Sequence, residues 1–154
     1  MPMIDCTFKL NNKPMSIFKC GATLFPAFSG LGRHVNQWVS ACLASEGPIP
    51  PGTYYIFDRQ VGGLQGPFDR LFGKRRDWFA LYAIDGRIDD ETYCNEVKRG
   101  LFRLHPKGTL GISQGCITID SPTDFQYLRT ILTNAKPSAV PGSTLRAYGK
   151  VWVR

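Results

Sequence analysis

Short runs of β-branched and aromatic residues, separated by turn-forming residues, constrain the fold of this chain more than any other feature. The 154 residues include 16 Gly and 11 Pro, a load that suits a strand-and-loop fold better than a helix bundle. Runs of this kind between turn signals predict strands. We expect them at residues 4–10, 15–20, 53–58, 78–84, 100–105, 116–119 and 144–153. The turn sequence Asn11-Asn12-Lys13-Pro14 would join the first two into a hairpin. The chain is therefore expected to be mainly β.

One segment is predicted to be helical. Ser121 is a suitable N-cap, Pro122 suits the first helical position, and Asp124 provides an acid in the first turn. The helix should end before Pro137, because the residue ahead of a proline disfavours helical angles. An apolar stripe at helical spacing follows the cap: Phe125, Leu128, Ile131 and Leu132.

Length and patterning predict a single domain over residues 1–154, since no repeat, low-complexity tract or linker interrupts the chain. No run approaches the ~20 apolar residues of a membrane span, and we expect no membrane insertion. The start at Met1 has no basic segment followed by an apolar run, so no secretory signal is expected. The net charge of +7 would attract a polyanion. The only tight basic cluster, Lys74-Arg75-Arg76, lies in no nucleic-acid-binding motif, and we expect no nucleic-acid partner.

The five cysteines are Cys6, Cys20, Cys42, Cys94 and Cys116, and no two form a C-x-x-C pair. The odd count fits four structural cysteines and one reactive thiol. In an oxidising compartment the first four could form two disulfides, and all three pairings stay open. The alternative is that some of them are small buried hydrophobic residues.

A histidine at a strand end is the first part of a candidate site. Because side chains alternate along a strand, Phe102 and Leu104 should face one way and Arg103 and His105 the other. Pro106 holds His105 extended and ends the strand.

A cysteine after a glycine is the second part. Ile117 and Ile119 share a face that suits the core, which leaves Cys116 and Thr118 on the opposite face. Gly115 allows a tight turn that brings amide N–H groups near the reacting atom, where they could form an oxyanion hole.

The short loop between the two parts could return Cys116 beside His105, which would take the thiol proton and leave a nucleophilic thiolate. Ser113 could help to hold the oxyanion. An inert buried Cys116 and a structural His105 are the alternatives, and a zinc site of Cys94, His105 and Cys116 fits no common ligand spacing. We expect no metal and no organic cofactor.

His105 followed by Ser113-x-Gly115-Cys116 and an aliphatic residue resembles the signature of the L,D-transpeptidase catalytic domain. The resemblance implies a β-sandwich in which the cysteine attacks the peptide stems of peptidoglycan and the histidine activates it. The segment Pro51-Gly52-Thr53-Tyr54-Tyr55-Ile56 is similar to a strand of that family that lines the substrate cleft, which makes Tyr54 a candidate substrate contact.

Two positions depart from the ordinary family pattern. Thr118 stands where the family has an arginine two residues after the cysteine, and Gln114 replaces a histidine. Both remain candidate substrate contacts. Arg103, on the predicted face of His105, is the candidate substitute for holding a substrate carboxylate.

These departures point to a subfamily. The pattern from Arg103 to Gly108, the pattern from Gly111 to Ile117 and the early Phe28-Ser29-Gly30 resemble the L,D-transpeptidase-like effectors of type VI secretion systems. The resemblance implies L,D-carboxypeptidase activity and D-amino-acid exchange on tetrapeptide stems. It also implies a toxin made in the cytoplasm, delivered by the secretion machinery into a target cell's periplasm, and neutralised by a cognate immunity protein.

Three other functions stay open. A housekeeping L,D-transpeptidase that cross-links its own cell's wall would need an export signal. A papain-like peptidase or amidase would place its cysteine before its histidine, whereas His105 precedes Cys116 here. A non-enzymatic binding module would use the basic surface alone.

Overall fold

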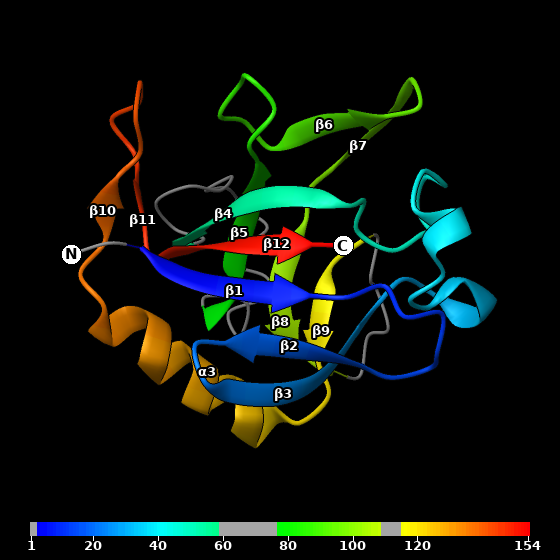
Figure 1. Cartoon of the computed structure of the whole chain (residues 1–154), viewed down its shortest axis with the longest axis horizontal. Coiled ribbons are helices and arrows are strands. Elements are labelled where there is room, and N and C mark those ends of the chain that lie inside the picture. Colours follow the sequence, from blue (N-terminus) through cyan, green and yellow to red (C-terminus); the bar gives the residue numbers. More distant parts are fainter. Residues whose placement is uncertain (1–2, 59–76, 109–114) are drawn as a thin grey trace.

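The computed structural model describes residues 3–58, 77–108 and 115–154. In this part of the chain, eight strands form a closed barrel in the order β1-β12-β4-β5-β8-β9-β3-β2 (Figure 1). The barrel strands are β1 (Ile4–Phe8), β2 (Ser16–Cys20), β3 (Thr23–Ser29), β4 (Gly52–Asp58), β5 (Phe79–Ala83), β8 (Arg103–Pro106), β9 (Ile117–Ile119) and β12 (Gly149–Val153). The prediction of a mainly β protein is confirmed.

The other elements lie around the barrel. They are the hairpin of β6 (Glu91–Cys94) and β7 (Val97–Gly100), the pair β10 (Ser138–Ala139) and β11 (Arg146–Ala147), the 3-10 turns η1 (Gly32–His34) and η2 (Trp38–Ser40), and the helix α3 (Pro122–Asn134). In Figure 1 the β6–β7 hairpin projects above the barrel and α3 lies below it. No helix in the described ranges has the length and apolar character needed to cross a membrane.

Closure of the barrel depends on its first and last strands. β1 pairs in parallel with β12, from Ile4 opposite Gly149 to Phe8 opposite Val153, and pairs antiparallel with β2 on its other side. Every barrel strand therefore has two neighbours, and no sheet edge is left. The resemblance had implied a β-sandwich; the structure differs because this parallel ladder joins the two ends of the sheet.

The core fills the barrel and extends to α3. Alternate strand residues point inward, and the buried cluster includes phenylalanines such as Phe8 and Phe18. The helix begins as predicted, with the Ser121 side chain accepting a hydrogen bond from the Asp124 amide at 3.3 Å. The predicted stripe also holds: three of its members are fully buried in the same cluster, and Ile131 packs against it.

Three strand regions were not predicted from the sequence: β3, the β6–β7 hairpin and β10. β3 contains Pro26, which usually argues against a strand inside a sheet. The predicted strand 100–105 begins only at Arg103, because Gly100 belongs to β7 and Leu101 adopts φ 57°, which interrupts the extended run. The basic cluster Lys74-Arg75-Arg76 lies outside the described residues.

Candidate active site

The strands β8 and β9 lie side by side in parallel, with Leu104 opposite Ile117 and His105 opposite Thr118. Leu104 and Ile117 are fully buried inside the barrel. Their neighbours along each strand must point outward, since side chains alternate. The outer face thus carries four polar residues that the sequence placed there, each 3–7% exposed: Arg103, His105, Cys116 and Thr118. The predicted faces of both segments are confirmed.

The His105 ring is held in a defined orientation. Its Nδ1 donates a hydrogen bond to the Pro106 carbonyl oxygen at 2.8 Å, because a carbonyl can only accept. In the neutral imidazole, a proton on Nδ1 leaves Nε2 as the ring nitrogen that can accept a proton. Thr118 Oγ1 lies 3.5 Å from Nε2, and the Trp78 ring stacks on the imidazole with centroids 4.2 Å apart. The histidine is therefore oriented by a backbone carbonyl, which leaves no trace in a sequence, and by an indole.

Cys116 immediately precedes β9, and its sulfur is 4.0 Å from the Leu101 carbonyl oxygen. Leu101 is itself unusual, because a bulky residue with φ 57° occupies a region that costs about 1–2 kcal/mol. Observed strain of this kind concentrates at functional sites. Gly115, the residue before Cys116, also has a positive φ of 93°. Two backbone positions near the sulfur, Leu101 and Gly115, therefore have positive φ.

Gly115 has no room for a side chain. A Cβ at this position would lie 2.6 Å from Arg99 Nη2 and 2.6 Å from the Phe102 ring. Glycine is required for both its positive φ and this close approach. The predicted role of Gly115 in bringing amides near Cys116 remains a hypothesis. Ser113, predicted to help hold the oxyanion, and Gln114, predicted as a substrate contact, lie outside the described residues.

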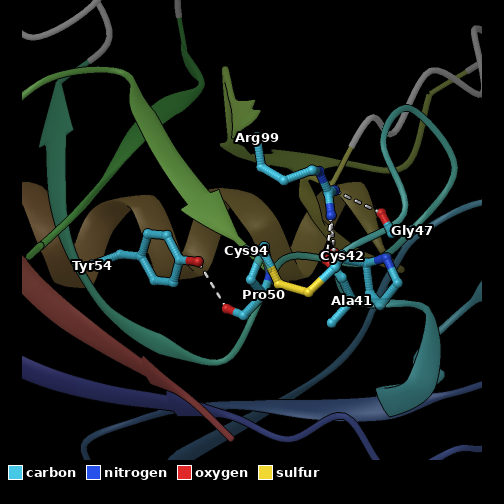
Figure 2. Close-up of a disulfide and its surroundings, with 8 residues drawn as sticks. Ala41, Cys42, Gly47, Pro50, Tyr54, Cys94 and Arg99 are labelled. Carbon is cyan, nitrogen blue, oxygen red and sulfur yellow. Dashed lines mark hydrogen bonds between the residues drawn. A yellow bond between two sulfur atoms is a disulfide. The ribbon is translucent and has the colours of Figure 1, made fainter. Parts of the chain in front are cut away.

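Arg99, on β7, is a site residue that sequence reasoning missed. Its guanidinium is buried and donates hydrogen bonds to the carbonyl oxygens of Ala41, Pro48 and Gly47, the last at 3.1 Å (Figure 2). Burial lowers the pKa of Arg99, an effect that the nearby Tyr54 hydroxyl partly offsets. All three acceptors are neutral carbonyls, so this positive charge next to Gly115 is not neutralised by them. No local motif marks the residue, because its partners come from a distant segment.

A disulfide joins the same two segments. Cys42 and Cys94 are bonded, with Cα atoms 5.1 Å apart, and link the tip of the β6–β7 hairpin to the segment after η2 (Figure 2). Because the Cys94 sulfur is engaged in this bond, the zinc alternative that used it is wrong. In the described part of the chain, no group of at least three potential metal ligands gathers. Cys6 and Cys20 are buried free thiols that face each other across β1 and β2.

Arg103 was predicted to hold a substrate carboxylate, but in the structure it holds Asp90. Its Nη1 and Nη2 donate to the two carboxylate oxygens of Asp90 at 2.9 and 2.7 Å. Burial acts to lower the pKa of Arg103, but the hydrogen bonds and charge of Asp90 outweigh it, aided by the nearby Cys116 sulfur, and the pKa is raised. The prediction missed Asp90 because that residue lies on a separate segment ahead of β6.

Tyr54 was expected to line the substrate cleft and instead lies in the core. It is 1% exposed, its hydroxyl donates to the Pro50 carbonyl oxygen at 2.7 Å, and its ring packs edge-on against Phe102. The inward position on β4 explains this, because the register with β12 points Tyr54 into the barrel beside Val151. In the structure Tyr54 contributes packing and a hydrogen bond, and its side chain does not reach the surface.

The fold and this outer face define a class: a closed, mainly β barrel with an oriented histidine on one of two adjacent parallel strands and a cysteine immediately before the other. Comparison with protein families narrows the class. The family described as the Tlde1 domain matches residues 23–143, and the chain therefore belongs to this family of type VI secretion effectors. No curated protein and no solved structure matches the chain.

Proposed function

We propose that this effector is a cysteine enzyme that acts on the tetrapeptide stems of peptidoglycan as an L,D-carboxypeptidase and D-amino-acid exchange enzyme. The observation that carries the proposal is the pairing of an oriented histidine and a cysteine on one outer face. The Nδ1 bond to Pro106 leaves Nε2 of His105 as the proton acceptor, and Cys116 immediately precedes the adjacent strand β9.

The first step is attack by the Cys116 thiolate on the carbonyl that joins the L-centre of diaminopimelate to the terminal D-alanine. His105 takes the thiol proton and then donates it to the leaving amine, so D-alanine leaves as the acyl-enzyme thioester forms. Against the effect of burial, Asp90 and, to a smaller extent, the nearby Cys116 sulfur raise the pKa of Arg103, so a guanidinium cation lies near the nucleophile with part of its charge offset by Asp90.

The second step is transfer of the acyl group. Water attacks the thioester and gives a tripeptide, or the amine of a free D-amino acid attacks and gives an exchanged tetrapeptide. His105 takes a proton from the attacking group, and the thiol is restored. Backbone N–H groups at Gly115 and Cys116 would hold the oxyanion in both steps. The reaction needs no metal or organic cofactor.

The biological setting belongs to the same proposal. Membership of a type VI secretion effector family favours an antibacterial toxin over a housekeeping wall enzyme. The toxin would be delivered by the secretion machinery into the target periplasm and would have a cognate immunity protein in the producing cell. Stems that have lost or exchanged D-alanine are poor donors for cross-linking, which would explain toxicity.

Mass spectrometry of purified tetrapeptide muropeptides tests the chemistry. We expect wild-type protein to yield tripeptide, and to yield exchanged tetrapeptide when a free D-amino acid is supplied. Cys116→Ala and His105→Gln should yield neither. The matched control is Cys20→Ala, which removes a thiol from the barrel core, away from the site, and should keep the activity. Intact tetrapeptide after incubation with a folded wild-type protein would remove the proposal, and cross-linked dimers would favour the housekeeping reaction.

A further inference from the structure

A cavity of about 370 Å³ lies near the C-terminal ends of β8 and β9. It is lined by residues of four regions of the chain: 14–15, 28–37, Lys107 and Asp120. Lys107 follows β8, Asp120 follows β9, and Phe28 belongs to β3, while Arg33 comes from η1. Its size lies at the lower end of the range for small-ligand pockets.

The strand register places this cavity next to the candidate catalytic pair. Phe28 is opposite Thr118, and Thr118 is opposite His105, so these three side chains form one row across β3, β9 and β8. At about 4.8 Å between neighbouring strands, Phe28 lies roughly 10 Å from His105.

Lys107 and Asp120 form the next row along the strands. The ladders continue past the strand ends, because the Lys107 amide donates to the Ile119 carbonyl and the Asp120 amide donates to the Pro26 carbonyl, both at 2.9 Å. Lys107 is two residues beyond His105 and therefore points to the same face. The cavity therefore includes Phe28 from the row that holds His105 and Thr118. Its other lining residues, Lys107 and Asp120, belong to the next row along the strands.

The lining combines positive charge with apolar surface. Lys107 Nζ lies 3.6 Å from Asp120, so the charge of this lysine is partly compensated. Arg33 is exposed, and within the described ranges it forms no ion pair. Met15, Phe28 and Val35 supply the apolar surface. This chemistry fits a ligand with an aliphatic segment that ends in a carboxylate, for which a guanidinium is a bidentate partner.

We propose that this cavity is the donor-stem subsite and that Arg33 binds the free α-carboxylate of the glutamate that precedes diaminopimelate. The inference rests on the proposed function. In a tetrapeptide stem this glutamate is linked through its side chain, which leaves its α-carboxylate free at the end of a short aliphatic segment. That carboxylate lies seven bonds from the scissile carbonyl, roughly 9 Å when extended. Phe28 pairs with Thr118, two residues beyond Cys116, so the cavity that Phe28 and Arg33 line begins roughly 8 Å from the nucleophile, within this reach.

The test compares two tetrapeptide stems that differ only in this carboxylate, one free and one amidated. Binding is measured by calorimetry on the Cys116→Ala variant, which cannot turn the stem over. Turnover is measured on protein with Cys116 intact. We expect the amidated stem to bind about tenfold more weakly, and to show a KM about tenfold higher with kcat little changed. Arg33→Gln should bind both stems equally weakly, and Arg33→Lys should recover part of the preference.

Lys136→Gln is the matched control, because it removes the same charge from an exposed residue beyond α3 and should keep the full preference. Equal binding of the two stems, or an unchanged preference in Arg33→Gln, would overturn the subsite. Selective binding of the free-carboxylate stem without any turnover would support the subsite and overturn the proposed reaction. If the stems neither bind nor react, both proposals are wrong.

Discussion

Substitution of Gly115 by alanine should destabilise the fold, and the size of the effect can be worked out from its surroundings. Alanine at φ 93° costs about 1–2 kcal/mol in backbone strain. The new Cβ would meet Arg99 Nη2 and the Phe102 ring, each at 2.6 Å. Arg99 cannot easily withdraw, because it is bonded to the Gly47 carbonyl, and Phe102 belongs to the core. Overpacking of this kind costs about 1–3 kcal/mol. Alanine also restricts the unfolded chain more than glycine does, which offsets this destabilisation by about 0.4–1 kcal/mol. We expect a net loss of about 1–5 kcal/mol, centred near ~3 kcal/mol.

Urea unfolding followed by tryptophan fluorescence measures this loss as a lower midpoint at unchanged slope. Gly108→Ala is the matched control from the same region, because its Cβ would meet nothing within 4 Å and its φ is not positive. It should change the free energy of unfolding by less than about 0.5 kcal/mol. If Gly115→Ala matched the control, the argument that Arg99 and Phe102 confine this glycine would be refuted.

Three further predictions concern the disulfide, the helix cap and alkaline stability. Replacing Cys42 and Cys94 together by serine should cost about 4 kcal/mol, since the bond spans 52 residues; reductant should reproduce this loss in wild type and add none in the variant. Ser121→Ala should cost about 1 kcal/mol in thermal unfolding, because the N-cap hydrogen bond is lost; an unchanged stability would contradict this role of Ser121. Burial and then the Asp90 charge raise the pKa of Tyr82 to about 12. The unfolded phenol ionises near pH ~10, so stability should fall as pH rises from 10 to 12, and less steeply in Tyr82→Phe.

Short-range physics made the outer face of β8 and β9 predictable. Side-chain alternation is a local rule, so the positions of His105 and Cys116 relative to Leu104 and Ile117 follow from the sequence alone. The cap of α3 is equally local, because Ser121 and Asp124 are three residues apart. In both cases the deciding contacts lie within one element or between two short ones.

Long-range contacts account for what could not be predicted. Arg103 was correctly placed on its face, but its partner Asp90 comes from another segment, and the alternation rule has no information on what covers a face. The sequence around Arg99 would predict an exposed side chain. Arg99 is buried because the segment around Gly47 folds over it. Tyr54 fits a strand motif, yet the motif does not state which side of β4 faces inward.

The parallel pairing of β1 with β12 also bears on how the molecule folds. A ladder between Ile4 and Gly149 requires the longest loop closure in the barrel, and such contacts slow folding. Until β12 is inserted between β1 and β4, both of these strands present unpaired backbone groups. The chain therefore remains an open sheet until β12 has been synthesised and has paired with both of these strands. C-terminal truncation before Gly149 should leave an open sheet with unpaired edge strands at β1 and β4. Such a sheet should aggregate instead of forming a smaller folded domain.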